Sequence, residues 1–451
     1  MNPVHIGLDV DFYRTKLYND ASVKRLKSRS CLHDKAFFTM KRYTGSNIPF
    51  FIPTEANNMA HKTGLEEYYV IRGQKKMRFG YTTGSCAAAA CKGAALMLLG
   101  RKKLDSVPLM TPKGILLDLE LHDVQIEENQ VTCAVKKDAG DDPDTTNGIL
   151  VYATVSKTKE PGIQIDGGIG VGRVTKPGLS QQIGEAAINP VPRAMIFREA
   201  EEASVAYDYE GGLKVVIFVP EGVEIGRKTF NPRLGITGGI SILGTSGIVE
   251  PMSEKALVES IHVEMKQHFT QGEQYILATP GNYGADYLRE HMTLPFERNI
   301  KCSNYVGETI DMAVDMGVKG ILFVAHIGKF VKVAAGIMNT HSHSADARME
   351  VLASNALRAG AGGDTARAIL NCNTTDEALN ILHDTGFLQP AMGEIMKRIQ
   401  FYLNHRSYEQ IRLGAVVFSN VYGYLGQTED AQGLIEEIKK QDTELQKVNK
   451  N

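Results

Sequence analysis

The sequence predicts an α+β first domain followed by a Rossmann-like α/β second domain. Up to about residue 260, strand-like apolar runs alternate with glycine-rich turns, and only two segments have the length and composition of long helices. After Gln271 the order becomes strand, loop and helix, and this order repeats along the chain. The predicted parts are an N-terminal extension at 1–64, the first domain at 65–268, the second domain at 269–426 and a polar C-terminal tail at 427–451.

The N-terminal extension is predicted to be poorly ordered. Four basic residues lie close together in it, and the surrounding residues have no apolar periodicity. The four are Lys24, Arg25, Lys27 and Arg29. Two alternatives stay open: the segment has a partner of its own, or Met59 is the true start of the protein.

The composition is that of a soluble globular enzyme. Of 451 residues, 23% are charged and 43% hydrophobic, and a formal net charge of -2 argues against a general nucleic-acid binder. No apolar run has the length to span a bilayer, and the N-terminus lacks the apolar core of a secretory signal. Six cysteines without CxxC spacing argue against a zinc site. We therefore expect a cytoplasmic protein with no nucleic-acid partner, no membrane partner and no bound metal.

The first domain is expected to contain three strands and two long helices. The strands are predicted at 131–135, 149–155 and 213–219, and the helices at 87–99 and 253–268. The first helix follows a segment rich in hydroxyls and glycine, where Thr82, Thr83 and Ser85 can cap the helix and Gly84 allows unusual backbone angles. Such a helix N-terminus can receive a carboxylate or phosphate. The alternative is a well-capped helix packed tightly through its alanines.

An acidic segment, Asp141-Asp142-Pro143-Asp144, resembles a magnesium or calcium site in its density of carboxylates. However, Pro143 fixes a turn and no further ligands follow in the sequence. We therefore interpret the segment as a solvated acidic loop.

Polar residues follow the predicted strands of the second domain. Strands are expected at 274–278, 320–325 and 415–419, with another near Ile300. Ligands of such folds bind at the carboxyl ends of parallel strands. The polar residues at these ends are Thr279, Pro280, Gly281, Asn282 and Gly284 after one strand, Ser303 and Asn304 after another, and His326, Gly328 and Lys329 after a third. A plain turn at 280–281 is the alternative for the first group.

Four further residues allow more than one interpretation. His326 is either a satisfied buried histidine or a proton acceptor near a ligand, and its place at a strand end favours the second. His341 and His343 favour hydrogen bonding over metal binding, because residues two apart on a helix diverge. Cys302 is interpreted as a small buried residue, because the sequence fixes no base beside it.

Several motifs, in order, resemble one family. The stretch 78–92 reads RFGYTTGSCAAAACK and resembles the signature of the cobalt-precorrin-5B (C1)-methyltransferase family, CbiD. The motifs that follow in the expected order are Gly167–Gly170 with Thr175–Leu179, Gly184–Arg193, Asn231–Ile236, Gly239–Ser253 and Gly320–Arg348. The resemblance covers about residues 65–425 and includes the acidic loop at 137–144. It implies a CbiD-like two-domain fold.

The resemblance also implies a reaction. Members of the family are understood to transfer a methyl group from S-adenosylmethionine to ring carbon C1 of a cobalt-containing tetrapyrrole, in the anaerobic route to vitamin B12. The carboxylates of such a macrocycle call for Arg and Lys donors. The basic candidates are Arg173, Lys176, Arg193, Arg227, Lys228 and Arg233.

On this basis we expect S-adenosylmethionine at 279–284 and 326–329, with Ser303 and Asn304 as further contacts and the tetrapyrrole in an interdomain cleft. Lys329 and His341 join the substrate-binding candidates. His326 is the expected proton acceptor, while Thr83 and Ser85 are further catalytic candidates, with Gly84 and Ser85 facing the cleft. A homo-oligomer, or transient contact with neighbouring pathway enzymes, is left open.

Three other classes remain. A nicotinamide-dependent reductase would use a similar α/β domain, but the expected acidic residue after the second strand is replaced by Ala325-His326. A non-catalytic tetrapyrrole carrier would need the basic residues and no nucleoside site. A phosphotransferase is suggested weakly by Gly244-Thr245-Ser246-Gly247, although no GxxxxGK[ST] motif is present.

Overall fold

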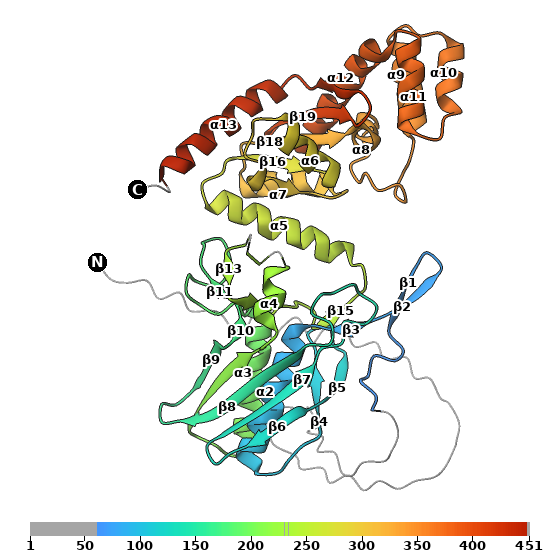
Figure 1. The fold of residues 1–451 in the computed structure, drawn as a ribbon. Helices are drawn as coiled ribbons and strands as arrows, with labels where there is room; N and C mark the ends of the chain where they lie inside the picture. Colours follow the sequence, from blue (N-terminus) through green and yellow to red (C-terminus); the bar gives the residue numbers. More distant parts are fainter. Residues whose placement is uncertain (1–60, 230, 233, 449–451) are drawn as a thin grey trace, which may run out of the picture. The chain divides into compact units, whose positions relative to one another are not determined.

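The computed structural model describes residues 61–229, 231–232 and 234–448. Nearly all of the predicted N-terminal extension, and the substrate-binding candidate Arg233, lie outside the described residues. The described chain is a mixed α/β protein with two five-stranded sheets and several two-stranded ones (Figure 1).

The first five-stranded sheet has the order β6-β7-β8-β12-β9. Its strands are β6 (His122–Ile126), β7 (Gln130–Lys136), β8 (Leu150–Thr158), β9 (Ile163–Gly167) and β12 (Gly212–Phe218). All neighbours are antiparallel except β12 and β9. Buried and half-buried residues alternate along β8, so one face of the sheet is turned to the core. The strands predicted at 131–135, 149–155 and 213–219 are confirmed.

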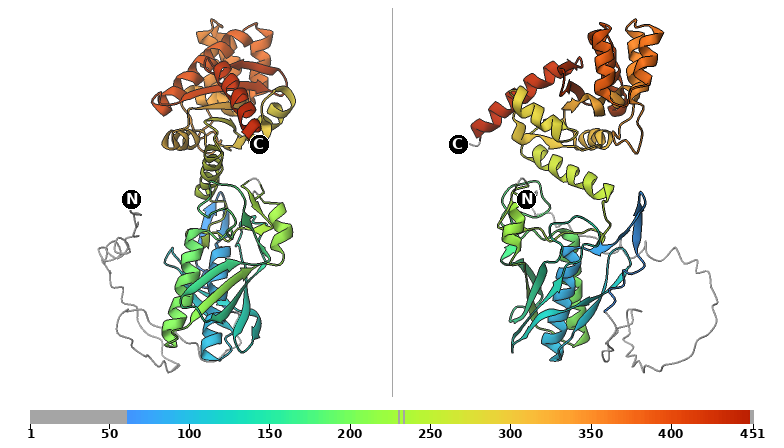
Figure 2. Two further views of the ribbon diagram at one scale, coloured as in Figure 1. Left: turned by 90° about the vertical axis from the view of Figure 1, so that its left-hand side faces the viewer. Right: turned by 45° about the vertical axis from the view of Figure 1, so that its right-hand side comes forward.

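Two helices cover this sheet, α2 (Thr83–Gly100) and α3 (Pro190–Ala206), and they lie against each other (Figures 1 and 2). The prediction of a helix at 87–99 is confirmed by α2. Among the described helices, α2 is the single one long and apolar enough to cross a membrane, but 83% of that stretch is buried inside the protein. It is therefore placed as a core helix.

The helix α3 was missed by the sequence prediction, which limited the long helices to two. Its first turn contains Pro190 and Pro192. Proline usually argues against a helix in a sequence, although it is tolerated in the first turn. Only one side of α3 is buried, through residues such as Met195, Ile196 and Ala203. Apolar residues such as Phe197 and Val205 are exposed elsewhere on the helix, which weakens the apolar periodicity of its sequence.

Short paired strands complete this half of the chain. The hairpin β1 (Tyr69–Arg72) and β2 (Lys75–Arg78) is antiparallel, as are β4 (Ser106–Met110) with β5 (Leu116–Glu120), β3 (Gly80–Tyr81) with β15 (Ile248–Val249), and β11 (Arg173–Val174) with β13 (Ile236–Thr237). The pair β10 (Gly170–Val171) and β14 (Gly239–Ile240) is parallel, and α4 (Gly222–Arg227) packs on these two strands.

The second five-stranded sheet has the order β17-β16-β18-β19-β20. Its strands are β16 (Tyr275–Thr279), β17 (Ile300–Lys301), β18 (Gly320–His326), β19 (Arg412–Ser419) and β20 (Gly423–Gln427). The first four in this order are parallel, and β20 pairs antiparallel with β19. The strands predicted at 274–278, 320–325, 415–419 and near Ile300 are confirmed.

Apolar side chains are buried on both faces of the second sheet. Leu277, Leu322 and Val416 pack in one cluster with residues of α6 (Asn282–His291) and α13 (Ala431–Val448). Ile276, Ile321 and Phe323 belong to another cluster with residues of α5 (Glu254–Thr270), α7 (Val306–Met316) and α12 (Leu388–Ser407). Burial on both faces explains why these strands read as continuous apolar runs.

Two helices near the predicted boundaries pack on the second sheet. Ile261 and Met265 of α5, which lies before the predicted boundary at 268, belong to its core. The predicted tail from 427 contains α13, which buries Leu434 and Ile438. The many charged residues of α13 masked its apolar periodicity in the sequence.

The segment between β18 and α12 is mainly helical, apart from residues 336–347, which form turns and irregular structure. It comprises α8 (Ile327–Phe330), η2 (Val331–Ala335), α9 (Arg348–Arg358), α10 (Gly363–Leu370) and α11 (Thr375–Asp384). The first two form a short helical span directly after His326.

Candidate functional site at the carboxyl edge of the second sheet

The chain changes direction between β16 and β18. From β16 it passes through α6 to β17 on one side, then returns through α7 to β18 on the other side of β16. In open α/β sheets, ligands bind outside the carboxyl ends of the strands at such a switch point. The loop after β16 and the loop after β18 therefore form the candidate site, and they hold the two groups of residues predicted from the sequence.

The loop after β16 is fixed by its backbone and by Thr279. The carbonyl of Thr279 accepts hydrogen bonds from the backbone N–H groups of Gly281 and Cys302, each over 3.0 Å. The hydroxyl of Thr279 accepts a 2.9 Å hydrogen bond from the amide of Asn299. Gly281 has φ 113°, a value that other residues rarely adopt. The loop thus joins the ends of β16 and β17.

The helix α6 begins directly after this loop. Its first residue, Asn282, accepts a hydrogen bond from the amine of Lys301 over 3.2 Å. Gly284 faces β18 so closely that a methyl group there would lie 2.4 Å from the carbonyl oxygen of Val324. Gly284 is therefore required for packing, and a role in cofactor binding stays a prediction.

His326 is the last residue of β18 and caps α8. Its Nδ1 accepts a hydrogen bond from the backbone N–H of Gly328 over 3.1 Å. Its Nε2 is buried and has no hydrogen-bond partner among the described residues. The rings of Tyr283 and Phe418 lie 5.7 and 5.5 Å from its ring. Burial lowers the pKa of His326, and the charge of Asp376 opposes this only in part.

Lys329 brings a positive charge to the same edge. A methyl group on Gly281 would lie 3.2 Å from the amine of Lys329, so the side chain reaches from α8 to the loop after β16. Burial lowers the pKa of this amine. The structure therefore brings together Gly281, His326 and Lys329, as expected from the sequence.

A second group of predicted residues is joined by hydrogen bonds. Asn304 accepts from the backbone N–H of Thr340 over 2.9 Å through its carbonyl oxygen, and its side chain accepts from the hydroxyl of Thr340 over 3.3 Å. The buried amine of Lys332 donates to the carbonyl oxygens of Thr340 and Ala345, which holds this segment in place. Ser303 has φ 53°, in the left-handed region.

The histidines of this segment are placed for hydrogen bonding. His341 is exposed, and its Nδ1 accepts from the backbone N–H of His343 over 3.1 Å. Within the described part of the chain, no group of three His, Cys, Asp or Glu residues is placed to hold a metal ion. Cys302 is fully buried, and burial raises its pKa to about 12, which confirms a structural thiol.

The start of α2 is buried, including Gly84 and Ser85, which were predicted to face the cleft. The hydroxyl of Ser85 donates to the carbonyl of Gly247 over 2.7 Å, and that of Thr83 accepts from the backbone N–H of Leu243 over 3.0 Å. The backbone N–H of Gly84 donates to the carbonyl of Leu243 over 3.0 Å. These polar groups already have protein partners. The hydroxyl-rich motif at the start of α2 is therefore explained by contacts within the fold. Catalytic roles for Thr83 and Ser85 stay predictions.

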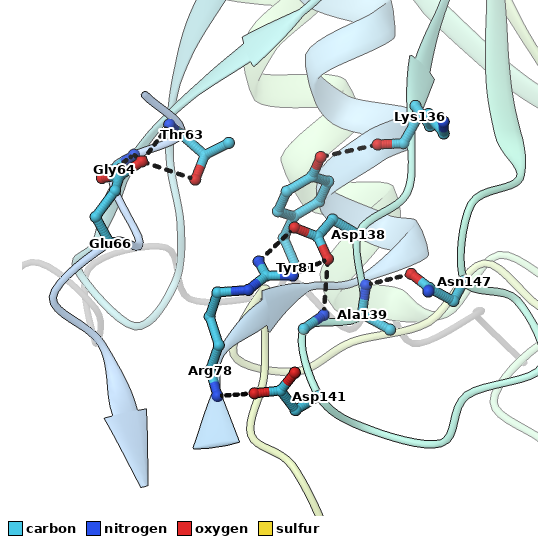
Figure 3. A network of polar contacts seen from close by, with 11 residues as sticks. Thr63, Gly64, Glu66, Arg78, Tyr81, Lys136, Asp138, Ala139, Asp141 and Asn147 are labelled. Carbon is cyan, nitrogen blue, oxygen red and sulfur yellow. Dashed lines mark hydrogen bonds and ion pairs between the residues drawn. The ribbon is translucent and has the colours of Figure 1, made fainter. Parts of the chain in front are cut away.

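The acidic loop makes structural contacts (Figure 3). The carboxylate of Asp138 pairs with the guanidinium of Arg78, and that of Asp141 accepts from the backbone N–H of Arg78 over 2.6 Å. Asp142 accepts from the backbone N–H of Met252 over 2.8 Å, while Asp144 pairs with the buried amine of Lys137. The loop is therefore built into the fold and is not simply solvated.

The basic candidates of the first half are mostly paired already. Arg173 pairs with Asp166 at 2.7 Å and donates to the carbonyl of Gly167 over 2.5 Å. Arg193 donates to the carbonyl of Ile165 over 3.1 Å, whereas Lys176 is exposed. Arg227 forms an exposed pair with Glu224.

Comparison with known proteins identifies the family. The family model described as CbiD matches residues 70–251, and the model described as CbiD, C-terminal domain, matches residues 339–429. The cobalt-precorrin-5B C(1)-methyltransferase of Ruminiclostridium cellulolyticum is 51% identical over 355 residues, which are 79% of this chain and 92% of that protein. This chain belongs to the CbiD family.

Two more members of the CbiD family are similar to this chain. The cobalt-precorrin-5B C(1)-methyltransferase of Alkaliphilus metalliredigens is 44% identical over 373 residues, covering 83% of this chain and 98% of that protein. The crystal structure of a cobalamin biosynthesis protein (cbiD) from Archaeoglobus fulgidus is 29% identical, covers 64% of this chain and 88% of its own, and has a TM-score of 0.34.

In this CbiD family chain, sequence reasoning missed two residues beside His326. Tyr283 stands inside the predicted loop, and its ring near His326 was not foreseen. Asp376 lies 50 positions further along the chain than His326, and its charge reaches the imidazole because α11 returns to the end of β18. No motif links such distant positions, so sequence spacing could not have found Asp376.

Proposed function

We propose that this chain transfers a methyl group from S-adenosylmethionine to C1 of cobalt-precorrin-5B, giving cobalt-precorrin-6A in anaerobic cobalamin biosynthesis. The observation that carries the proposal is the 51% identity to a cobalt-precorrin-5B C(1)-methyltransferase over 92% of that protein. The protein is further proposed to be cytoplasmic.

Two domains are proposed, an α+β domain and a Rossmann-like α/β domain. Support comes from the buried apolar residues, since those of 65–248 and those of 261–438 form separate clusters. Four adjacent parallel strands with apolar clusters on both faces further support the second assignment. The packing of α5 and α13 favours a second domain of about 254–448.

The cofactor is proposed to bind at the carboxyl edge of the second sheet. Gly281 leaves space for a ligand beside the backbone there, because only the amine end of Lys329 lies within 4 Å of the position that its Cβ would occupy. Tyr283 offers a 64% exposed aromatic ring beside it, and His326 has a buried polar atom without a partner. These features suit a ligand that has both an aromatic ring and polar groups.

The proposed chemistry needs positioning more than a covalent enzyme intermediate. The cofactor supplies a methyl group on a sulfonium; the electron pair of C1 forms the new carbon–carbon bond as the sulfur–methyl bond breaks and S-adenosylhomocysteine leaves. Holding the two reactants in line lowers the barrier. Lys329, His341, Lys176, Arg173 and Arg193 are the proposed contacts for carboxylates of the tetrapyrrole, although Arg173 would have to share its guanidinium with Asp166.

The direct test is anaerobic incubation of the purified protein with cobalt-precorrin-5B and methyl-labelled S-adenosylmethionine. Mass spectrometry and NMR should find the label at C1 of the product. Binding of the cofactor without transfer would show that the acceptor is wrong or that a partner is missing. Absence of both binding and transfer would refute the methyltransferase assignment.

The cofactor site is tested by Gly281→Val. We expect binding of S-adenosylhomocysteine, measured by calorimetry, to be lost while circular dichroism shows an intact fold. Since φ 113° strains any other residue, Gly317→Ala is the matched control, with φ 74° and nothing within 4 Å of its Cβ position. Equal affinity of the two variants would place the cofactor elsewhere.

A further inference from the structure

The hydrogen bond to His326 decides where the imidazole carries its proton. A backbone N–H can only donate, so the bond from Gly328 uses the lone pair of Nδ1. In the neutral ring, the single proton then resides on Nε2. Burial lowers the pKa of His326, which favours this neutral form. The group that His326 offers to a ligand is therefore an N–H donor.

This donor has no partner within the described residues, where Nε2 is buried without a hydrogen bond. A buried donor left unsatisfied costs about 1–3 kcal/mol. Native proteins retain few such groups, and each requires an explanation. A bound ligand with an oxygen acceptor would supply the missing partner at the switch point of the sheet.

A buried acceptor without a partner lies in the same region. Oδ1 of Asp376 is buried without a hydrogen bond, and the charge of Asp376 acts on His326. The neighbouring residue Thr375 is close to the loop after β18, because a methyl group on Gly328 would lie 3.6 Å from its hydroxyl and 3.2 Å from Nδ1 of His326. The start of α11 and the end of β18 thus present one unpaired acceptor and one unpaired donor.

We propose that His326 binds the ligand as a neutral hydrogen-bond donor through Nε2–H, and that Asp376 accepts a hydrogen bond from the same ligand. The ligand portion recognised here carries an oxygen acceptor next to an N–H or O–H donor. This inference rests on the proposed function in identifying the ligand as the methyl donor, whose amino-acid head and ribose both have this chemistry. His326 then does not accept a proton, because Nδ1 is already occupied.

Substitutions at His326 separate a donor from a proton acceptor. The side-chain amide of glutamine places an N–H near the position of Nε2 but does not take up a proton, whereas asparagine places its polar atoms near Nδ1. We expect His326→Gln to keep its affinity for S-adenosylhomocysteine and its turnover within about threefold of wild type. His326→Ala and His326→Asn should lose about tenfold or more in affinity. Turnover lost equally in His326→Gln and His326→Ala would overturn the donor role.

Asp376→Ala tests the acceptor. We expect its affinity for S-adenosylhomocysteine to fall by about fivefold or more. The matched control is Asp364→Ala, since Asp364 also stands in the first turn of a short helix but is paired at the surface with Arg367. Equal affinity of Asp376→Ala and Asp364→Ala would remove Asp376 from the proposal.

Two probes distinguish the sources of the ligand group. S-adenosylhomocysteine contains both the ribose and the amino-acid head, whereas 5′-methylthioadenosine keeps the adenosine with its ribose and lacks the amino-acid head. If His326→Ala weakens both probes, Nε2–H binds the ribose; if it weakens only the first, Nε2–H binds the amino-acid head. If neither probe is weakened, the proposal fails.

The tautomer can be read in the full-length protein without any ligand. In protein labelled with ¹⁵N-histidine, comparison with the spectrum of His326→Gln assigns His326 among the 12 histidines. We expect the signature of a protonated Nε2 and an unprotonated Nδ1 at neutral pH. The opposite tautomer, or an imidazolium, would overturn the inference while leaving the proposed methyl transfer unaffected. Conversely, a wild-type protein that binds no S-adenosylhomocysteine would refute the proposed function, and the tautomer would still be decided.

Discussion

The carboxylate of Asp138 holds the guanidinium of Arg78 through two hydrogen bonds, 2.5 Å from Nη1 and 2.9 Å from Nη2. Burial alone would raise the pKa of Asp138, but the hydrogen bonds from Arg78 and from the backbone N–H of Gly140 outweigh it, so the pKa is lowered. The pair fastens the acidic loop to the end of β2. The backbone N–H of Tyr81, in the strand that leads into α2, donates to the carbonyl of Asp138 over 2.8 Å.

Removing the arginine should loosen this connection. We expect Arg78→Ala to lower the free energy of unfolding by about 1 kcal/mol, since both side chains are partly exposed. The matched control is Arg227→Ala, which breaks a pair with Glu224 whose side chains are both 71% exposed, and which should cost at most about 0.5 kcal/mol. Urea unfolding measures both, and equal values would show that the pair with Asp138 adds no stability.

Gly80 leaves no space for a side chain beside the acidic loop. A methyl group there would lie 2.2 Å from the carbonyl carbon of Ala139 and 2.4 Å from the carbonyl oxygen of Asp138. Because backbone must move to accommodate it, we expect Gly80→Ala to destabilise the protein by at least about 2 kcal/mol. In contrast, Gly393→Ala within α12 meets nothing within 4 Å and should stabilise by about 0.5–1 kcal/mol. Thermal unfolding of the two variants should shift in opposite directions.

The buried ion pair between α2 and α3 should matter more than any surface pair. The amine of Lys92 lies 2.8 Å from the carboxylate of Glu199, whose side chain is only 2% exposed. Lys92→Met removes one partner of a buried charge, so we expect a loss of about 2–4 kcal/mol in urea unfolding. In Lys92→Met the buried carboxylate of Glu199 keeps only the partly exposed Arg198 as a partner. The double variant Lys92→Met/Glu199→Met should be less destabilised than Lys92→Met, because it also removes that buried charge. A larger loss in the double variant would contradict this explanation.

The stability of the protein should depend on His326 in acid. The folded-state pKa of His326 is lowered by burial, so the unfolded state binds the proton more readily. Its contribution to stability is therefore present above the unfolded-state pKa of about 6.5 and declines as pH falls through that value toward the folded-state pKa. Between about pH 7.5 and about pH 5, wild type should lose more stability than His326→Gln. Parallel curves for the two proteins would show that the imidazole is not desolvated.

Local patterns in the sequence were sufficient to predict much of the fold. The strands β7, β8, β12, β16, β18 and β19 and the helices α2 and α5 were predicted because each has a strong apolar pattern. The helix α3 was not, since Pro190 and Pro192 open it and its apolar residues are not confined to its buried side. The sides of α13 and α5 that face the second sheet were also missed, because packing depends on partners distant in sequence.

The residues of the candidate site were also predicted only in part. Gly281 and His326 could be predicted because the ends of parallel strands meet at one edge of a sheet. Asp376 could not be predicted, since its place near His326 depends on the return of α11. Polar groups at the start of α2 were expected to face a ligand, yet Gly247 and Leu243 occupy them, and these partners lie about 160 residues further along the chain.

The near-complete burial of α2 limits how relatives of this protein can diverge. Nearly every position from Thr83 to Leu98 is enclosed by neighbouring segments, so none of the sides of the helix is free to accumulate substitutions. At the buried alanines of α2, larger side chains would push α3 or the sheet away, which favours small residues at these positions. The alanine-rich stretch is therefore a durable family signature for reasons of space. A relative could keep this signature after its ligand site had changed, so recognition by this motif identifies ancestry and does not by itself locate the ligand site.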